Sequence, residues 1–189
     1  MSPHILALDV AGAPHRWINV RGAAHYYATD MIAWEIGTNE FVLHGGTQRS
    51  TGIQSMIRAR SIVAIKGRDF IVPHFDHVPA LTKEMLLARD RFLCAYCAQR
   101  FRVEQLDMEH IVPRSKRGEG SWMNLVAACK ACNNRKANRT PEAAGMKLHY
   151  VPYVPNRYEA FILSNRKILA DQMEFLLQGV PKSSRMHVA

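Results

Sequence analysis

The chain has 189 residues, of which 48% are hydrophobic and 22% are charged. These values are typical of a folded globular protein and argue against extensive disorder. The net charge of +9 predicts a polyanionic partner, without by itself choosing between nucleic acid and an anionic membrane. No run of about eighteen apolar residues occurs, which argues against a transmembrane helix. The start lacks the pattern of a secretion signal, so we expect a cytoplasmic protein with no membrane partner.

The first eighty residues predict an α/β extension. His4–Val10 is mostly apolar and reads as a strand. Asn19 is suited to cap a helix over about 20–33, because apolar residues recur there at helical spacing. Residues 44–52 are polar and glycine-rich, which predicts a loop. We expect residues 1–80 to serve in dimerisation, DNA contacts or partner contacts.

Two further β-type runs, Ser61–Ile65 and Phe70–Val72, predict a hairpin. Pro73 and Pro79 then bracket a linker, which is the expected domain boundary. The linker also contains two histidines with a two-residue gap. These residues, His74 and His77, have no other candidate ligands nearby, so we do not expect them to bind metal.

Helices are expected on both sides of the cysteine-rich segment. Thr82 is a good N-cap for a short helix over Lys83–Arg89. A longer helix is expected from Arg157 to about Leu177, ended by Gly179. Its apolar stripe predicts that residues 146–189 form a C-terminal helix packed on the core, with the last eight residues as a frayed tail.

The positive charge and the cysteines gather in the same segment. Residues 81–140 carry 12 basic and 6 acidic side chains, which is two-thirds of the net charge. All four cysteines lie there as two pairs, each with a two-residue gap: Cys94, Cys97, Cys129 and Cys132. Two such knuckles supply the four sulfur ligands that zinc favours, and a closed four-sulfur site leaves no open position. The pattern predicts a structural zinc ion.

The two knuckles are separated by 31 residues, whereas zinc ribbons use about 15–20. The excess indicates an inserted element. Leu106–Val112 reads as a strand, residues 114–121 as a basic loop, and Trp122–Ala128 as the approach to the second knuckle. A helix is expected from Asn133 onward. The insert therefore predicts strand, loop, second strand or turn, and helix.

Three side chains of the insert suit hydrolytic chemistry. Glu109 and His110 are adjacent at the end of the first predicted strand. An imidazole can act as a general base near neutral pH, and a carboxylate can bind a hard divalent cation. Asn133 offers a further oxygen ligand. Sulfur ligands for zinc and oxygen ligands for magnesium would form separate sites.

These residues resemble the HNH endonucleases, also called ββα-metal or His-Me finger nucleases, in the branch with two CxxC knuckles. Glu109-His110 followed by Ile-Val-Pro stands where the family has Asp-His, an apolar pair and Pro. Asn124, fourteen residues after His110, is similar to the central asparagine of the motif. Asn133 matches the third position, where the family has His or Asn. The resemblance is strongest over about 81–145.

The resemblance implies an α+β fold: a ββα-metal nuclease core at 81–145, stapled by a four-cysteine zinc site. An α/β N-terminal extension (1–80) and a C-terminal helix with its tail (146–189) would flank this core. The implied activity is metal-dependent hydrolysis of DNA phosphodiester bonds, leaving 5′-phosphate and 3′-hydroxyl ends.

The resemblance also assigns roles to single residues. His110 would be the general base, and Glu109 with Asn133 would hold one Mg²⁺ or Mn²⁺ ion. Asn124 would pin the loop and orient His110. Basic residues near the motif would contact the phosphate backbone without reading sequence: Arg114, Lys116, Arg117, Arg135, Lys136 and Arg139.

Several features depart from the family pattern or admit another interpretation. Glu109 replaces the commoner Asp, and the usual Gly-Gly of the loop is split as Gly118-Glu119-Gly120. Asn133 is a weaker ligand than His and would also serve as a helix cap. A non-catalytic, zinc-stabilised nucleic-acid-binding module is the alternative function. A homodimer is expected if a single site per chain makes double-strand cuts.

Overall fold

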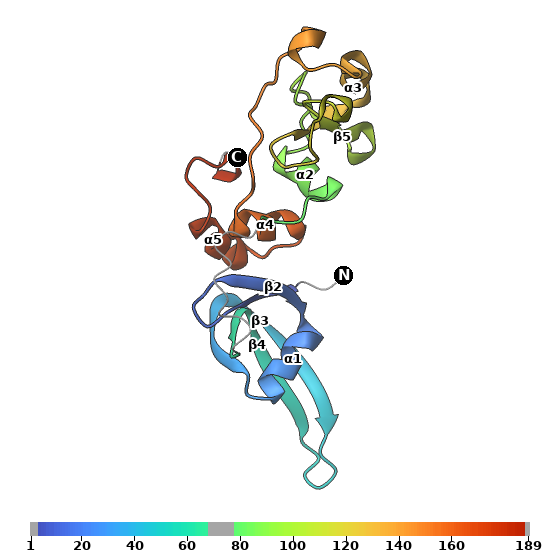
Figure 1. Cartoon of the computed structure of the whole chain (residues 1–189). Coiled ribbons are helices and arrows are strands. Elements are labelled where there is room, and N and C mark those ends of the chain that lie inside the picture. The colour runs from blue at the N-terminus through green and yellow to red at the C-terminus, as the bar shows by residue number, and fades with distance from the viewer. Residues whose placement is uncertain (1–3, 68–77, 188–189) are drawn as a thin grey trace. The chain divides into compact units, whose positions relative to one another are not determined.

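The computed structural model describes residues 4–67 and 78–187, which fall into two compact units (Figure 1). The first unit combines Met1–His77 with Arg157–Ala189. The second unit is the continuous segment Val78–Asn156. Each unit has its own hydrophobic core, so each is described separately below.

The C-terminal segment belongs to the first unit, which corrects the expectation that it packs on the nuclease core. Its apolar side chains, including Phe161 and Leu176, pack against Leu6, Leu8 and Ile62 of the N-terminal sheet. The sequence did not indicate this association, because the C-terminal helices and the N-terminal sheet lie on either side of the second unit along the chain. Two expected features lie outside the described residues: the strand at 70–72 and the histidine pair at 74 and 77.

The first unit is built on a four-stranded mixed sheet in the order β2-β1-β4-β3. Strand β1 is antiparallel to β2 and parallel to β4, and β3 is antiparallel to β4. Its elements are β1 (His4–Leu8), β2 (Pro14–Asn19), α1 (Val20–Ala28), β3 (Ile32–Thr47), β4 (Gln54–Ile65), α4 (Arg157–Ser164), α5 (Ala170–Gln178) and the 3₁₀ turn η5 (Arg185–His187).

Both faces of this sheet are covered, because successive side chains of a strand point to opposite faces. In β1, Ile5 and Ala7 join the cluster that contains Ala23 of α1. Leu6 and Leu8 join the opposite cluster, which the C-terminal helices complete. A strand buried on both faces reads as a continuous apolar run, which explains the sequence of β1.

Helix α1 starts where the sequence predicts and ends earlier. The side chain of Asn19 accepts a hydrogen bond from the backbone N–H of Gly22 at 2.6 Å, which confirms the predicted N-cap. The helix stops at Ala28 rather than near residue 33. Asp30 then takes a left-handed φ of 53°, and Ile32 begins β3 by pairing with Ile65 of β4. Pairing across the sheet therefore outweighs the helical spacing of the sequence.

The C-terminal segment forms two helices where one was expected. Between α4 and α5, the side chain of Asn165 accepts a hydrogen bond from the backbone of Lys167 at 3.0 Å, a local turn that competes with helix. Gln172 accepts from the backbone of Leu169 at 3.1 Å, where α5 begins. The expected frayed tail is also partly ordered, because Ser184 donates a hydrogen bond to the buried Glu159.

Asp171 of α5 connects this helix to the edge of the sheet. Its Oδ2 accepts hydrogen bonds from the backbone N–H groups of Thr38 (2.8 Å) and Asn39 (3.0 Å), and from the hydroxyl of Ser61 (2.6 Å). Gly37 precedes these residues with φ +106°, and a Cβ there would lie 2.2 Å from the Ser61 hydroxyl. The irregular pairing of β3 at this point is therefore held by one carboxylate.

The second unit contains the strand–strand–helix order that the sequence predicts. Strands β5 and β6 pair antiparallel, from Leu106 opposite Cys129 to His110 opposite Leu125. Thr82 caps helix α2 as expected, accepting from the backbone of Met85 at 3.2 Å. The elements are α2 (Lys83–Arg89), η2 (Val103–Gln105), β5 (Leu106–His110), η3 (Arg114–Lys116), β6 (Leu125–Cys129), α3 (Lys130–Lys136) and η4 (Glu142–Ala144).

A buried ion pair ties α2 to the second strand. The guanidinium of Arg89 is paired with Asp90 at 2.8 Å, and neither side chain is exposed. Arg89 also donates to the backbone carbonyls of Trp122 (2.6 Å) and Leu125 (2.8 Å), and Asp90 accepts from Ala127 at 2.8 Å. Because each charge is hydrogen-bonded, the pair avoids the penalty of an unsatisfied buried ion. It fixes where β6 begins.

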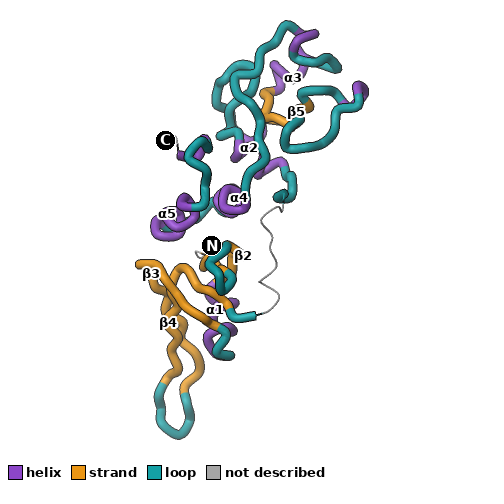
Figure 2. Tube along the Cα trace, turned by 60° about the vertical axis from the view of Figure 1, so that its left-hand side comes forward, coloured by secondary structure: helices purple, strands orange, loops and turns teal. Residues whose placement is uncertain are grey.

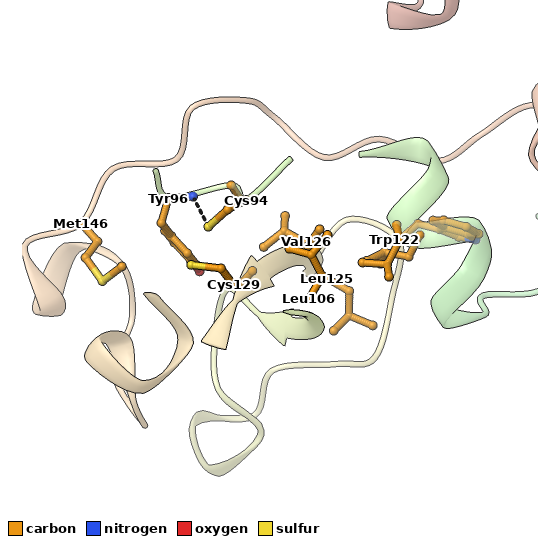
Figure 3. Packing of buried hydrophobic residues seen from close by; sticks show 13 residues of the cluster. Cys94, Tyr96, Leu106, Trp122, Leu125, Val126, Cys129 and Met146 are labelled. Atoms are coloured by element: carbon orange, nitrogen blue, oxygen red, sulfur yellow. Dashed lines mark hydrogen bonds between the residues drawn. The ribbon is translucent and has the colours of Figure 1, made fainter. Parts of the chain in front are cut away.

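Figure 3 shows the core of the second unit, where Trp122, Leu125 and Val126 lie at one end and Cys94 and Cys129 toward the other. The two units together confirm the expected α+β class, with a ββα element in the second unit and a mixed sheet with helices in the first. In the described part of the chain, no helix has the length and apolar character needed to cross a bilayer.

The hydrogen bonds to Asp171 predict an acid-sensitive contribution to stability. Burial raises the pKa of this carboxyl, but the hydrogen bonds outweigh it and lower the pKa from 3.8 to about 2. The stability contributed by the ionised carboxylate of Asp171 is therefore fully present above pH 3.8 and is lost as the pH falls through about 2. Near neutral pH, Asp171→Asn should lower the free energy of opening this region by about 1–2 kcal/mol, measured by amide hydrogen exchange of β3 and α5.

The matched control for this measurement is Asp30→Asn, since the Asp30 side chain is 97% exposed in its pair with Lys66. That change should leave exchange in β3 and α5 unaltered. The difference between Asp171→Asn and the parent should shrink as the pH is lowered toward 2. A difference that persists unchanged in acid would show that the charge of Asp171 is not what stabilises the region.

Candidate functional site

The four cysteines come together at one end of the second unit. Cys94 and Cys97 lie in a tight turn, where the backbone of Ala98 donates to Cys94 and the backbone of Cys94 donates to Gln99, both at 2.9 Å. Cys129 ends β6 and Cys132 lies in the first turn of α3. The four Sγ atoms all lie within 4.8 Å of one another. The fold thus brings together two knuckles that are far apart in sequence.

This arrangement fits a tetrahedral metal ion. Zinc–sulfur bonds of about 2.3 Å place sulfur atoms roughly 3.8 Å apart, compatible with the observed cluster. All four thiols are free, with no disulfide between them. Backbone N–H groups point at the sulfurs, with Tyr96 donating to Cys94 and Cys132 donating to Cys129, each at 3.5 Å. Burial and the neighbouring sulfurs raise the pKa of Cys132. Burial also acts to raise the pKa of Cys94, but backbone hydrogen bonds outweigh it and lower that pKa.

Glu109, at the end of β5, forms an ion pair that the sequence did not predict. Its Oε1 lies 2.6 Å from the Nζ of Lys136, on the last turn of α3. The Lys136 side chain is fully buried and that of Glu109 is 14% exposed. Lys136 was expected to contact DNA phosphates, and this expectation is wrong. Its ammonium group is buried and paired with Glu109, so a phosphate in solvent does not reach it. Lys136 holds Glu109 against the helix instead.

His110 follows Glu109 and lies beside a different cation. Its Nε2 accepts a hydrogen bond from the Nε of Arg114 at 3.3 Å. Burial lowers the pKa of His110, and the positive charge of Arg114 lowers it further, while Glu109 acts in the opposite direction. The imidazole is therefore held in its neutral form near neutral pH, the form that can accept a proton.

Asn124 fastens the loop that follows β5. Its Oδ1 accepts from the backbone of Val112 at 2.9 Å, and its Nδ2 donates to the carbonyls of Val112 (3.1 Å) and Glu119 (2.8 Å). The backbone carbonyl of Asn124 also accepts from Ile111 at 2.8 Å. Gly118 completes this close packing, since a Cβ there would lie 1.7 Å from the carbonyl oxygen of Val112. One amide side chain therefore anchors both ends of the loop next to His110.

Asn133 lies within α3 rather than at its start. The helix begins at Lys130, and Cys129 is its N-cap, so the alternative role of Asn133 as a cap is wrong. Residues three apart on a helix share a face, and Lys136, three residues on, contacts Glu109. Asn133 is therefore on the side of α3 that faces β5. The fold brings Glu109, His110 and Asn124 to the same end of the β5–β6 pair, whereas Asn133 lies one turn before Lys136 on α3.

The remaining predicted phosphate contacts divide into two groups. Arg114, Lys116 and Arg117 lie in or just after the exposed turn η3, beside the Asn124-anchored loop. Arg135 is exposed on α3, whereas Arg139 donates to the carbonyls of Arg135 (2.6 Å) and Lys136 (3.2 Å) at the end of that helix. Arg139 thus satisfies helix carbonyls as well as contributing charge.

Two contacts of the site had not been predicted. Besides the Lys136 pair, the hydroxyl of Ser115 donates to the side chain of Asn138 at 2.6 Å, linking η3 to the segment after α3. The sequence signal for the Lys136 pair was its spacing of three residues from Asn133. This spacing places Lys136 on the same helix face as Asn133, the third motif residue. No comparable pattern points to Ser115.

The buried ion pair predicts a coupling between Glu109 and Lys136. Lys136→Met should lower the free energy of unfolding of the second unit by about 3 kcal/mol or more, because it leaves a largely buried carboxylate unpaired. In a Glu109→Gln background the same change should cost much less, giving a double-mutant coupling of about 1–3 kcal/mol. Chemical denaturation of the four proteins measures both quantities.

The matched control is Lys116→Met, which removes an exposed cation near the same site. It should leave stability nearly unchanged but weaken DNA binding, whereas Lys136→Met should leave the affinity for DNA close to that of the parent. Additive stability effects of Glu109→Gln and Lys136→Met would show that the two side chains are not coupled.

Comparison with known proteins supports the interpretation of the second unit. Residues 94–149 match a family model described as HNH endonuclease. A segment of 60 residues is 42% identical to the CRISPR-associated endonuclease Cas9 of Corynebacterium diphtheriae, and the match covers 31% of this chain and 5% of that relative. The family recognised from the motif spacing is therefore confirmed. The chain carries a domain of the HNH endonuclease family, which is a nuclease family, with four cysteines positioned to form a zinc site.

Proposed function

We propose that the chain is a metal-dependent DNA endonuclease in which His110 is the general base, cleaving to leave 5′-phosphate and 3′-hydroxyl ends. The observation that carries the proposal is the end of β5, where a neutral imidazole stands next to Glu109 and beside a loop fixed by Asn124. A nuclease needs an activated water and groups that neutralise the charge developing at phosphorus. The site supplies residues for both tasks.

His110 would take the proton from the attacking water. Its Nε2 lone pair is engaged by Arg114 at 3.3 Å in this structure. A guanidinium binds phosphate more strongly than it binds a neutral imidazole, because phosphate is charged and accepts two parallel hydrogen bonds. Binding of a DNA phosphate would therefore draw Arg114 to the substrate and free the imidazole. Arg114 would couple substrate binding to activation of the base.

In this proposal, Glu109 and Asn133 would supply two oxygen ligands to a hard divalent cation. The Oε1 of Glu109 accepts from Lys136, so its Oε2 would be the oxygen that binds the cation. In the described parts of the chain, the four cysteines are the only cluster of three or more His, Cys, Asp or Glu ligands, so water and substrate oxygens would complete the shell, as Mg²⁺ prefers. When bound, the ion would supply Lewis-acid stabilisation of charge on the phosphate and leaving oxygen.

Lys136 would keep Glu109 in place before a cation is bound. An unpaired carboxylate at this depth would be costly, and the 2.6 Å pair with Lys136 satisfies it from the side of α3. The exposed cations Arg114, Lys116, Arg117 and Arg135 would position the DNA backbone.

The four-cysteine cluster would hold structural zinc. It has four sulfur donors and no open position for substrate, so its role would be to fix β6 and α3 against the first knuckle. The chain spans one-twentieth of the Cas9 relative it matches. Any likeness to the activity or assembly of that whole protein is therefore limited to the shared segment.

His110→Ala should lower magnesium-dependent nicking of supercoiled plasmid by about 10²–10⁴-fold, because the general base is lost. The affinity for DNA and the zinc content should stay close to those of the parent protein, since the imidazole contributes to neither. Nicking is followed by the loss of supercoiled plasmid on a gel, with product ends mapped by labelling.

The alternative function, a zinc-stabilised module that binds nucleic acid without cutting it, makes the opposite prediction. In that case purified parent protein would bind DNA without nicking it in magnesium or manganese. Nicking that survives His110→Ala would instead show that the activity is real but that the base is misassigned.

Metal analysis of the folded protein should find about one zinc ion per chain. Cys129→Ser removes a sulfur ligand but keeps a hydroxyl that can cap α3. Because only the metal ligand is lost, this change should abolish zinc binding and unfold the second unit. Elemental analysis together with circular dichroism measures these effects. Zinc well below stoichiometry in folded, active parent protein would contradict a structural role for the cluster.

A further inference from the structure

The first unit carries a two-stranded projection with the features of a nucleic-acid-binding surface. We define the arm as residues 41–59, the part of β3 and β4 beyond their contact with the rest of the sheet. Strand β1 pairs with β4 only from Ile62 to Ala64. From Phe41 opposite Ala59 to Thr47 opposite Gln54, β3 and β4 pair with each other alone. Figures 1 and 2 show this hairpin projecting from the sheet.

The arm is long, and it is open to solvent. Its first and last cross-strand pairs are six positions apart along β3, from Phe41 to Thr47, which corresponds to about 20 Å at the usual rise of a strand. Every residue from 44 to 56 is exposed. In contrast, Phe41 packs into the α1 cluster with Ala59, so the arm is anchored at its base and free along its length.

The tip of the arm is ordered by its own hydrogen bonds. Gln48 donates to the carbonyl of Ile53 and accepts from the backbone of Gly52, both at 2.8 Å, and its side chain accepts from the hydroxyl of Thr51 at 2.9 Å. Lower in the hairpin, the hydroxyl of Ser55 donates to Gly46 at 3.2 Å. This turn presents Arg49 outward on a preformed scaffold, which reduces the entropy lost when a partner binds.

The chemistry of the arm matches a polyanion. The arm contains no Asp or Glu, whereas it contains two arginines, Arg49 and Arg58. Arg58 is paired with Glu40 at the base of the arm, at 3.1 Å. In the described part of the chain, no side chain or carbonyl is recorded as a partner of Arg49. Most of the other tip side chains are hydrogen-bonding groups: Thr47, Gln48, Ser50, Thr51, Gln54 and Ser55.

Size also favours duplex DNA as the partner. A two-stranded ribbon, with strands about 4.8 Å apart, fits a major groove about 12 Å wide. Arg and Gln side chains pair with guanine and adenine edges there, and apolar side chains contact thymine methyl groups. Ile53 and Met56, 67% and 49% exposed, would supply the apolar contacts.

Pairing with a second copy of the chain is the competing use of such a hairpin, because its outer strand edges are open. The arm is poorly suited to it. Gly45 and Gly46 lie within β3 near the tip, and the register with β4 shifts between His44 and Thr47. Both features weaken an edge as a template for another strand, while the absence of acids favours a polyanion.

From these observations we propose that the arm binds duplex DNA by lying in its major groove, with Arg49 at the tip as the leading contact. The proposal rests on the proposed function in taking DNA as the substrate. It adds a second DNA contact on the first unit, separate from the nuclease site of the second unit.

The test measures binding without cleavage. The full-length chain with His110→Ala, free of added divalent metal, is titrated against a short fluorescein-labelled DNA duplex, and anisotropy is recorded over a range of salt concentrations. In this background Arg49→Ala should weaken binding about 3–10-fold and reduce the salt slope by about one. Arg49→Glu should weaken it by about tenfold or more. Replacing residues 45–55 by Asn-Gly, which closes a two-residue hairpin turn, should weaken it at least as much as Arg49→Glu.

The matched control is Arg21→Glu, the same charge reversal on the exposed face of α1. It should change the affinity much less than Arg49→Glu does. Equal losses for the two reversals would mean that only net charge matters, and would overturn the proposal. Affinities within about twofold of the parent for Arg49→Glu and for the shortened arm would overturn it as well.

Two further measurements separate the remaining outcomes. Sedimentation equilibrium reports the oligomeric state; if shortening the arm converts a dimer to a monomer with unchanged affinity for DNA, the arm is a self-association surface and the proposal is wrong. Plasmid nicking by the parent protein tests the proposed function independently. Loss of binding in the arm variants, with no nicking by the parent, would support DNA binding by the arm and refute the nuclease assignment. Nicking by the parent, with unchanged binding in the arm variants, would support the nuclease assignment and overturn the arm proposal.

Discussion

The second unit depends on the convergence of four sulfur atoms. Two strands of five residues each and a helix of seven bury too little apolar surface to be stable as an isolated element. The cysteine cluster joins this element to the turn at residues 94–97, with all four Sγ atoms within 4.8 Å. Because Cys129 is both a cluster member and the N-cap of α3, the same atom that would bind the metal also sets where the helix starts. The position of every residue on α3 follows from that start.

The candidate site is therefore held from three directions. The cysteine cluster fixes the beginning of α3, and the ion pair of Lys136 with Glu109 joins the end of α3 to the end of β5. Asn124 provides the third restraint, because its side chain hydrogen-bonds to the loop backbone at two places, Val112 and Glu119. A catalytic group gains efficiency when its neighbours restrict its motion, and His110 lies among these three restraints. Arg114, on the exposed side, donates to His110 and would turn to the DNA phosphate in the proposed function.

Much of the local structure could be predicted from the sequence. The caps at Asn19 and Thr82 use short-range hydrogen bonds that residue type alone indicates, and both occur as predicted. The strand–strand–helix order of the second unit and its family were also predicted, since the cysteine spacing and the motif spacing report one continuous segment. Strand β3 was missed, because its register with β4 is irregular at several points and its residues lack a clean alternation. A single C-terminal helix was expected because the apolar stripe continues from α4 into α5. The turn between them depends on the hydrogen bond from Lys167 to Asn165, which the stripe does not reveal.

By itself the sequence determined which segment is the nuclease-type domain, which residues are candidates for metal and base, and where the positive charge concentrates. These are properties of spacing and composition, and they do not depend on how distant segments pack. Only the tertiary structure decided that Lys136 is buried against Glu109, that residues 157–187 cover the N-terminal sheet, and that residues 41–59 project as a hairpin. The physical reason is the same in each case. Burial is set by contacts between segments far apart in sequence, so one lysine neutralises a carboxylate while another, with the same local signature, remains exposed to solvent.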